Sequence, residues 1–172
     1  MNTLKAEGVD RLLVRLDEVI AELSSAGRAA WRLDARVGRL EGWCYETRYR
    51  ENLASHLVTT FDKPRLLVAG NVPPLVAARR AGEIDTDDWA RMMSLDVLAW
   101  ARDLRDPAEP EVYVAIELSQ VIDESDVERA HERAAVLRRV LDQPVVACVD
   151  GEAILIQAEW RAQELGVLNL RG

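Results

Sequence analysis

The stretch that decides the fold is EVYVAIELSQVIDESDVERAHERA, residues 111–134. Its first part, Val112 to Leu118, is an apolar run interrupted only by Glu117, which is typical of a strand buried on both faces of a sheet. In its second part, Asp123 or Ser125 is the expected N-cap of a helix whose apolar residues recur at helical spacing. A buried strand next to an amphipathic helix is typical of the α/β class.

The same alternation continues on both sides of this stretch. We expect strands at residues 65–71, 95–103, 112–118, 143–151 and 167–170. The first of them, RLLVAGN, is expected to be buried, with a proline before it and Asn-Val-Pro-Pro after it. The element order is then helix, three strands, helix, strand, helix and strand. This order predicts a mixed sheet flanked by helices.

A separate helix is expected at the N-terminus, because apolar residues alternate there at spacings of three and four. They are Val9, Leu12, Leu16, Val19, Leu23, Ala26, Ala30, Leu33, Val37 and Leu40. This heptad pattern predicts a coiled coil that joins two copies of the chain as a homodimer. Two alternatives stay open: a helix lying across its own domain, and a break into a hairpin at Ser24–Gly27. The expected division is a coiled-coil helix at 1–41 and a domain at 42–172.

Composition limits the class of protein. The chain has 172 residues, of which 49% are hydrophobic, enough for one compact core with some length left over. It contains no run of eighteen apolar residues and no signal-peptide pattern, so we expect a cytoplasmic protein without a membrane partner. The two cysteines, Cys44 and Cys148, are far apart and are expected to be buried as small hydrophobic residues.

The charge of the chain bears on nucleic-acid binding in two opposite ways. The formal net charge is −8, with 30 acidic and 22 basic residues, opposite to the usual basic surface of a DNA-binding protein. The basic residues, however, are almost all arginine, since Lys5 and Lys63 are the only lysines. Arginine binds phosphate in a bidentate manner, so DNA remains a partner to consider.

Three carboxylates occupy informative positions: Glu46 in the helix before the first strand, Asp96 at the start of the second strand, and Glu117 near the end of the third. If the second and third strands form a hairpin, Asp96 and Glu117 become neighbours. Two carboxylates beside an apolar interior need a cation or a charged partner. Together with the carbonyl oxygen of Leu118 they are suited to Mg²⁺, which prefers oxygen ligands and retains several waters.

The element order, with LDV at 95–97 and IELSQ at 116–120, resembles the PD-(D/E)XK nuclease superfamily, which has the restriction-endonuclease-like fold. Within it, the chain looks most like small prokaryotic proteins that place a coiled coil before this domain. The resemblance implies cleavage of DNA phosphodiesters with Mg²⁺ or Mn²⁺. It also implies that Asp96 and Glu117 are catalytic and hold the metal, with Glu46 similar to a further acidic group. The superfamily's lysine falls on Ser119, a departure that puts catalysis in doubt.

A replacement for that lysine is available on the following helix. Arg129 and Arg133 lie four residues apart, and some members of the superfamily place the cationic residue on this helix. The alternative is an ordinary solvated face with pairs formed within the helix. Two functions therefore stay open: a metal-dependent nuclease that uses Arg129 or Arg133, and a catalytically inactive nuclease fold assembled through its coiled coil.

Overall fold

The computed structural model describes residues 3–171, with side chains at residues 15, 16, 19 and 20 and from residue 22 onward. The chain divides into two compact units, Met1–Trp43 and Cys44–Gly172. The first unit is part of helix α1 (Thr3–Glu51), which runs without a break through residues 24–27, so no hairpin forms there. The side chains of Val9 and Leu12, expected in the heptad pattern, lie outside the described residues. No helix among the described residues is long and apolar enough to cross a membrane.

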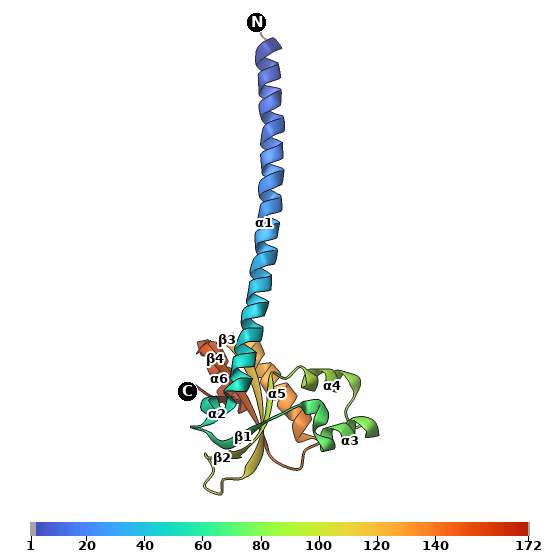
Figure 1. Cartoon of the computed structure of the whole chain (residues 1–172), viewed down its shortest axis with the longest axis vertical. Helices are drawn as coiled ribbons and strands as arrows, with labels where there is room; N and C mark the ends of the chain where they lie inside the picture. Colours follow the sequence, from blue (N-terminus) through green and yellow to red (C-terminus); the bar gives the residue numbers. More distant parts are fainter. Residues whose placement is uncertain (1–2, 172) are drawn as a thin grey trace. The chain divides into compact units, whose positions relative to one another are not determined.

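The second unit begins with the last residues of α1. After them, strands and helices alternate as expected (Figure 1). Its elements after α1 are α2 (Leu53–Leu57), β1 (Phe61–Leu67), η1 (Ala69–Asn71), α3 (Pro73–Ala81), α4 (Thr86–Met93), β2 (Val97–Asp103), β3 (Glu111–Ile122), α5 (Glu124–Arg138), β4 (Val145–Ile154), α6 (Ile156–Leu165) and β5 (Leu168–Asn169). The five strands lie in one sheet in the order β1-β2-β3-β4-β5. β1, β2 and β3 are antiparallel neighbours, whereas β3, β4 and β5 are parallel. The predicted α/β class with a mixed sheet is confirmed.

Two hydrophobic cores lie on the two faces of this sheet, because its central strands are apolar on both sides. One core contains Leu75 of α3, Met92 of α4 and Val127 of α5, together with apolar residues of α6. The other contains Tyr49 of α1 and Leu57 of α2. Helices therefore cover both faces, as the sequence of the central strands predicts.

The prediction of a buried first strand at residues 65–71 is wrong. β1 begins at Phe61 and ends at Leu67, and Phe61 is its only buried residue, while the others are half-buried or exposed. The strand lies at the edge of the sheet, where Pro64 is tolerated because one side needs no ladder hydrogen bonds. Lys63 has a positive φ of 50°, and the pairing with β2 shifts at this point. Residues 69–71 form the 3₁₀ turn η1 instead of continuing the strand.

β3 is longer than predicted, and its end is paired on one side only. Its pairing with β2 ends at Ile116, opposite Val97. Its pairing with β4 continues to Ile122, opposite Ile154. Residues 117–122 therefore form an overhang that projects past β2, and we call this segment the β3 overhang. It begins at Glu117, which the sequence placed near the end of the strand.

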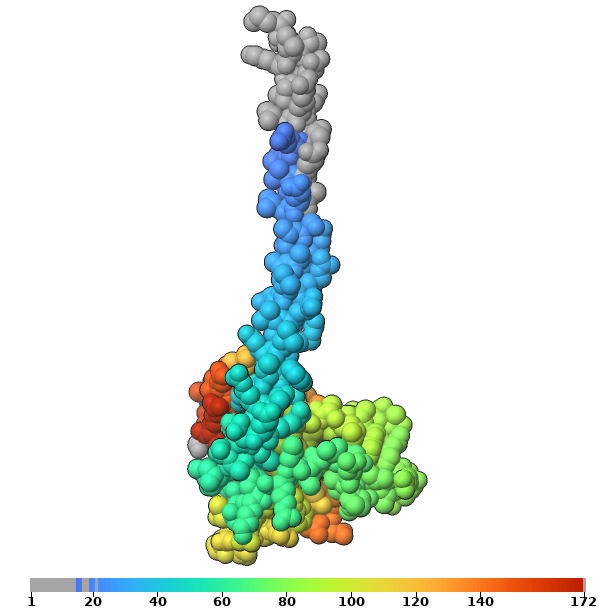
Figure 2. All heavy atoms as spheres, viewed as in Figure 1, coloured from blue at the N-terminus to red at the C-terminus, as the bar shows by residue number. Residues whose placement is uncertain are grey.

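Helix α5 begins where the sequence predicts, at a reciprocal cap. The Asp123 side chain accepts from the Asp126 N–H, and the Asp126 side chain accepts from the Asp123 N–H. The atoms of α3 and α4 form a lobe on one side of the folded unit, seen in green in Figure 2. Arg133 of α5 donates to the Ser94 carbonyl oxygen at 2.8 Å and so ties the end of α4 to α5.

The two cysteines differ in environment. Cys148 lies fully buried in β4, as expected, whereas Cys44 is exposed. The expectation that both are buried is therefore wrong for Cys44. The prediction rested on the usual burial of free cysteine, which does not tell on which side of α1 Cys44 lies.

The close approach of β3 and β4 gives the first testable prediction. Gly151 pairs with Ser119, and a Cβ added to Gly151 would lie against the Ser119 carbonyl oxygen and 2.9 Å from Cγ1 of Ile122. We expect Gly151→Ala to lower the free energy of unfolding by about 1–3 kcal/mol, because the backbone must move to admit the methyl group. Urea unfolding followed by circular dichroism measures this change.

Gly70→Ala is the matched control. A Cβ at Gly70 would meet the Met93 side chain, Cε at 3.5 Å and Sδ at 3.8 Å, which are ordinary contacts, so we expect a change within about 0.5 kcal/mol. Equal effects of the two substitutions would contradict the close approach of β3 and β4.

Candidate functional site: an acidic edge bound by arginines

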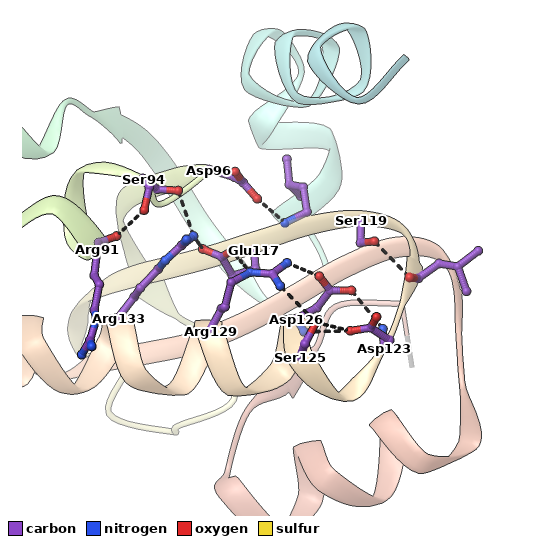
Figure 3. A network of polar contacts seen from close by, with 12 residues as sticks. Arg91, Ser94, Asp96, Glu117, Ser119, Asp123, Ser125, Asp126, Arg129 and Arg133 are labelled. Carbon is purple, nitrogen blue, oxygen red and sulfur yellow. Dashed lines mark hydrogen bonds and ion pairs between the residues drawn. The ribbon is translucent and has the colours of Figure 1, made fainter. Parts of the chain in front are cut away.

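The hairpin of β2 and β3 brings Asp96 beside the β3 overhang. Asp96 directly precedes β2, and its Oδ2 accepts a hydrogen bond from the Leu118 N–H at 2.8 Å. Since β2 no longer pairs with β3 beyond Ile116, the carboxylate takes the place of a strand partner for this N–H. Figure 3 shows Asp96 above the strand that carries Glu117. The two acids that the sequence predicts to be neighbours therefore lie together where β2 ends beside β3. We call this place the acidic edge.

Glu117 is the most deeply buried of the three predicted acids, with 2% of its side chain exposed. Two guanidinium groups from α5 reach it (Figure 3). Arg133 Nη1 forms an ion pair with Oε1, and Arg129 Nε donates to Oε2 at 3.4 Å. Both arginines that the sequence offered as substitutes for the missing lysine thus contact the acid of the third strand.

The two arginines differ in how firmly they are placed. Arg133 has only 13% of its side chain exposed and also binds the Ser94 carbonyl oxygen. Arg129 is 43% exposed and forms a second ion pair with Asp126. Its Nη1 also donates to Oγ of Ser125 at 3.1 Å. Arg133 is therefore the better-shielded cation, and Arg129 links Glu117 to the N-terminus of α5.

Glu46 is connected to this edge through Arg50. The Arg50 guanidinium donates to the backbone oxygen of Asp96 from Nε at 2.8 Å and from Nη2 at 2.5 Å. The same Nη2 lies 3.3 Å from Oε2 of Glu46, one turn earlier in α1. Glu46 is thus near Asp96, but an arginine stands between its carboxylate and the Asp96 backbone.

Ser119 does not supply the cation that the resemblance would place at its position. Its hydroxyl donates to the Val121 carbonyl oxygen at 3.0 Å, so the side chain is engaged within its own strand. Serine carries no charge and is shorter than lysine. Positive charge at Glu117 therefore comes from α5.

Full or partial burial raises the pKa of all three acids. Burial, reinforced by the charge of Asp96, raises the pKa of Glu117 to about 7, although Arg133 and Arg129 act in the opposite direction. Burial also raises the pKa of Asp96, against the Leu118 N–H and the arginines. The pKa of Glu46 is raised by burial and by Asp96. Each shift means that the ionised carboxylate is disfavoured here, and a nearby cation would favour it.

The donors at this edge fit a hard divalent cation by their chemistry. Asp96 and Glu117 offer carboxylate oxygens, and Mg²⁺ or Mn²⁺ is often held by one or two carboxylates together with water. Within the described part of the chain, no group of three or more His, Cys, Asp or Glu side chains is arranged to hold a metal ion. Asp96 and Glu117 would be the carboxylate ligands of a metal ion here, and the ion would compete with Arg133 for Glu117.

A cavity lies beside Asp96, on the side of β1. Its volume is about 260 Å³, and Arg50 and Asp96 contribute to its wall. The rest of the lining is apolar and comes from Leu66, Leu67, Val68, Ala69, Met92, Met93, Leu95 and Leu98. The acidic edge is therefore bordered by a space that accepts an apolar group.

Two residues of the site were not singled out from the sequence. Arg50 holds the backbone of Asp96, and Asp126 both caps α5 and binds Arg129. Each of them stands at the spacing of an ion pair within a helix, because Arg50 follows Glu46 by four residues and Asp126 precedes Arg129 by three. This spacing does not predict that Arg50 also contacts Asp96 or that Arg129 also contacts Glu117, because those contacts depend on the fold.

Comparisons with family models, with curated proteins and with solved structures find no match to this chain.

The coupling of the two acids gives the second testable prediction. We expect the Glu117 carboxyl to titrate near pH 7, so that it is mostly protonated at about pH 6 and mostly ionised at about pH 8. Asp96→Asn removes a nearby negative charge and should lower the pKa of Glu117. Carboxyl ¹³C chemical shifts measure both titrations. An unchanged midpoint in Asp96→Asn would refute the coupling.

Proposed function

We propose that the unit Cys44–Gly172 has the restriction-endonuclease-like fold of the PD-(D/E)XK superfamily. The topology supports this assignment: a helix precedes the antiparallel strands β1, β2 and β3, and α5 then leads to β4, which is parallel to β3. This is the order of elements on which the resemblance rests, with η1, α3 and α4 inserted between β1 and β2. The position of the acids adds support, because Asp96 lies at the start of β2 and Glu117 lies in β3.

On this fold we propose a metal-dependent nuclease that acts on DNA phosphodiesters. The observation that carries the proposal is the convergence of Arg133 and Arg129 on Glu117, beside Asp96, where Ser119 supplies no cation. An arginine on α5 thus stands where a nuclease of this superfamily needs positive charge. Its planar guanidinium is suited to a phosphate group.

Each residue has a distinct role in this proposal. Asp96 and Glu117 would hold Mg²⁺ or Mn²⁺. When bound, such an ion supplies positive charge that stabilises a phosphodiester under attack by water. Arg133 orients the phosphate and offsets its charge, because it is largely shielded from solvent and anchored to Ser94. Glu46 adds negative charge near Asp96, and Arg50 holds the backbone of Asp96 in place.

Plasmid nicking in the presence of Mn²⁺ tests this proposal. We expect nicking by the purified chain, and we expect Asp96→Asn and Glu117→Gln each to reduce its rate by about 100-fold or more. Arg133→Ala should also lower the rate, because the phosphate loses its cationic partner. Glu124→Gln is the matched control, since Glu124 is exposed in the first turn of α5 and should leave the rate unchanged. Nicking that survives Glu117→Gln would contradict the proposal.

A second candidate function is a catalytically inactive nuclease fold that serves assembly. It is favoured by a specific observation: both oxygens of Glu117 are already bound by arginines. Titration calorimetry with Mn²⁺ separates the two candidates. An inactive fold predicts no binding by the wild-type chain, and binding only after Arg129→Ala and Arg133→Ala together release Glu117. Binding by the wild-type chain that Asp96→Asn removes would contradict the inactive fold.

A further inference from the structure

A line of exposed aliphatic side chains runs along α1 in the unit Met1–Trp43. The described members of the heptad pattern are Leu16, Val19, Leu23, Ala26, Ala30, Leu33, Val37 and Leu40, which we call the seam. Its six larger residues are between 46% and 67% exposed. An extended aliphatic line on a single helix is unfavourable in water, because helices gain most of their stability from packing an apolar face.

The spacing of the seam identifies what covers it. Its residues alternate at intervals of three and four, which averages 3.5 residues per turn. A straight helix of 3.6 residues per turn lets such a line drift, so the line stays in contact only with another helix that coils around it. Five of the eight residues beside the seam are charged, and the other three are Ile20, Gly27 and Ala29. A large apolar side chain therefore widens the line only at Ile20. A narrow seam suits two strands rather than a larger bundle.

We propose that α1 binds the α1 of a second copy of this chain as a parallel, in-register coiled coil of two strands. Charge complementarity supports this partner. Counting Val37 as heptad position a, Arg36 is at position g and Glu41 is at position e. In a parallel pair, position g of one helix lies beside position e of the next heptad in the other helix. Arg36 of each copy thus meets Glu41 of the other.

Both side chains are available for this contact. Arg36 and Glu41 are exposed. Among the described side chains, neither forms an ion pair with another residue of its own chain.

In an antiparallel pair that overlaps this seam fully, Leu16 of one copy would lie beside Leu40 of the other, and Glu22 at position g would face Arg36. The two orientations therefore differ in the partner of Arg36, which is Glu41 in the parallel pair and Glu22 in the antiparallel pair. The charge-exchange and disulfide experiments below separate them.

A parallel coil has a consequence for the second unit. The Cys44–Gly172 units of both copies follow the same end of the coil in the chain, so each dimer carries two copies of the acidic edge at that end of the sequence. This inference does not rest on the proposed nuclease function, because it uses only residues of the first unit.

The mass of the full chain in solution tests the partner. We expect a dimer by multi-angle light scattering, and a monomer for the double substitution Leu16→Asp with Leu23→Asp. The matched control is Ser24→Asp with Ser25→Asp, which adds the same charges at positions b and c and should leave the dimer intact. A monomeric wild-type chain, or a control that dissociates like the seam variant, would overturn the proposal.

Charge exchange tests the register without disturbing the seam. Arg36→Glu alone and Glu41→Arg alone should each weaken the dimer by about 2- to 30-fold in dissociation constant, since two exposed pairs become repulsive. Combining the two substitutions should restore the wild-type constant. Additive weakening in the combined variant would overturn the parallel register.

Disulfide formation tests the orientation directly. In a Cys44→Ser background, Val37→Cys should form an intermolecular disulfide on oxidation, because the same position a faces itself across a parallel pair. Arg39→Cys, at the outward position c, should remain unlinked. Cys148 is fully buried and does not interfere. A dimer by mass in which Val37→Cys remains unlinked would overturn the parallel arrangement.

Discussion

The buried carboxylate of Glu117 is the constraint on which the folded unit and its site both depend. A side chain that is 2% exposed loses its hydration, and an ionised carboxylate in that state is costly unless charged donors replace the lost water. Arg133 and Arg129 provide those donors from α5. The position of α5 across β3 is thus set by charge as well as by the apolar residues of the core.

The same contacts extend from Glu117 to the neighbouring elements. Arg133 also binds the Ser94 carbonyl oxygen, which fixes the end of α4 two residues before Asp96. Arg129 also binds Asp126, which caps α5. Removal of one partner of a buried ion pair typically costs about 3–5 kcal/mol. Residues that hold the acids in place therefore contribute to stability, and the site is built from contacts that the fold needs.

Much of this arrangement follows from the sequence because its signals are local. The apolar run before Glu117, the cap at Asp123 and the hairpin of the second and third strands were all predictable. The hairpin placed Asp96 beside Glu117, and helical spacing placed two arginines on one helix. Whether those arginines face the acid or the solvent is decided by the packing of α5 on the sheet, which the sequence left open.

Other features depend on pairing that no local pattern reveals. Among the described residues, β1 is the first strand of the sheet and pairs only with β2, and its largely exposed side chains follow from that edge position. β3 continues through polar residues to Ile122 because β4 still pairs with it after β2 has ended. The role of Asp96 as acceptor for the Leu118 N–H exists only because β2 ends there.

The acidic edge also has a simple property as a set of charges. Four carboxylates, those of Glu46, Asp96, Glu117 and Asp126, lie with three guanidinium groups, those of Arg50, Arg129 and Arg133. Their ionised forms sum to −1, so this edge attracts or repels an ion only weakly beyond the Debye length of about 8 Å at physiological salt. Each of the three arginines is already paired with a carboxylate. An anion that bound one of these arginines would therefore have to displace a carboxylate of the protein.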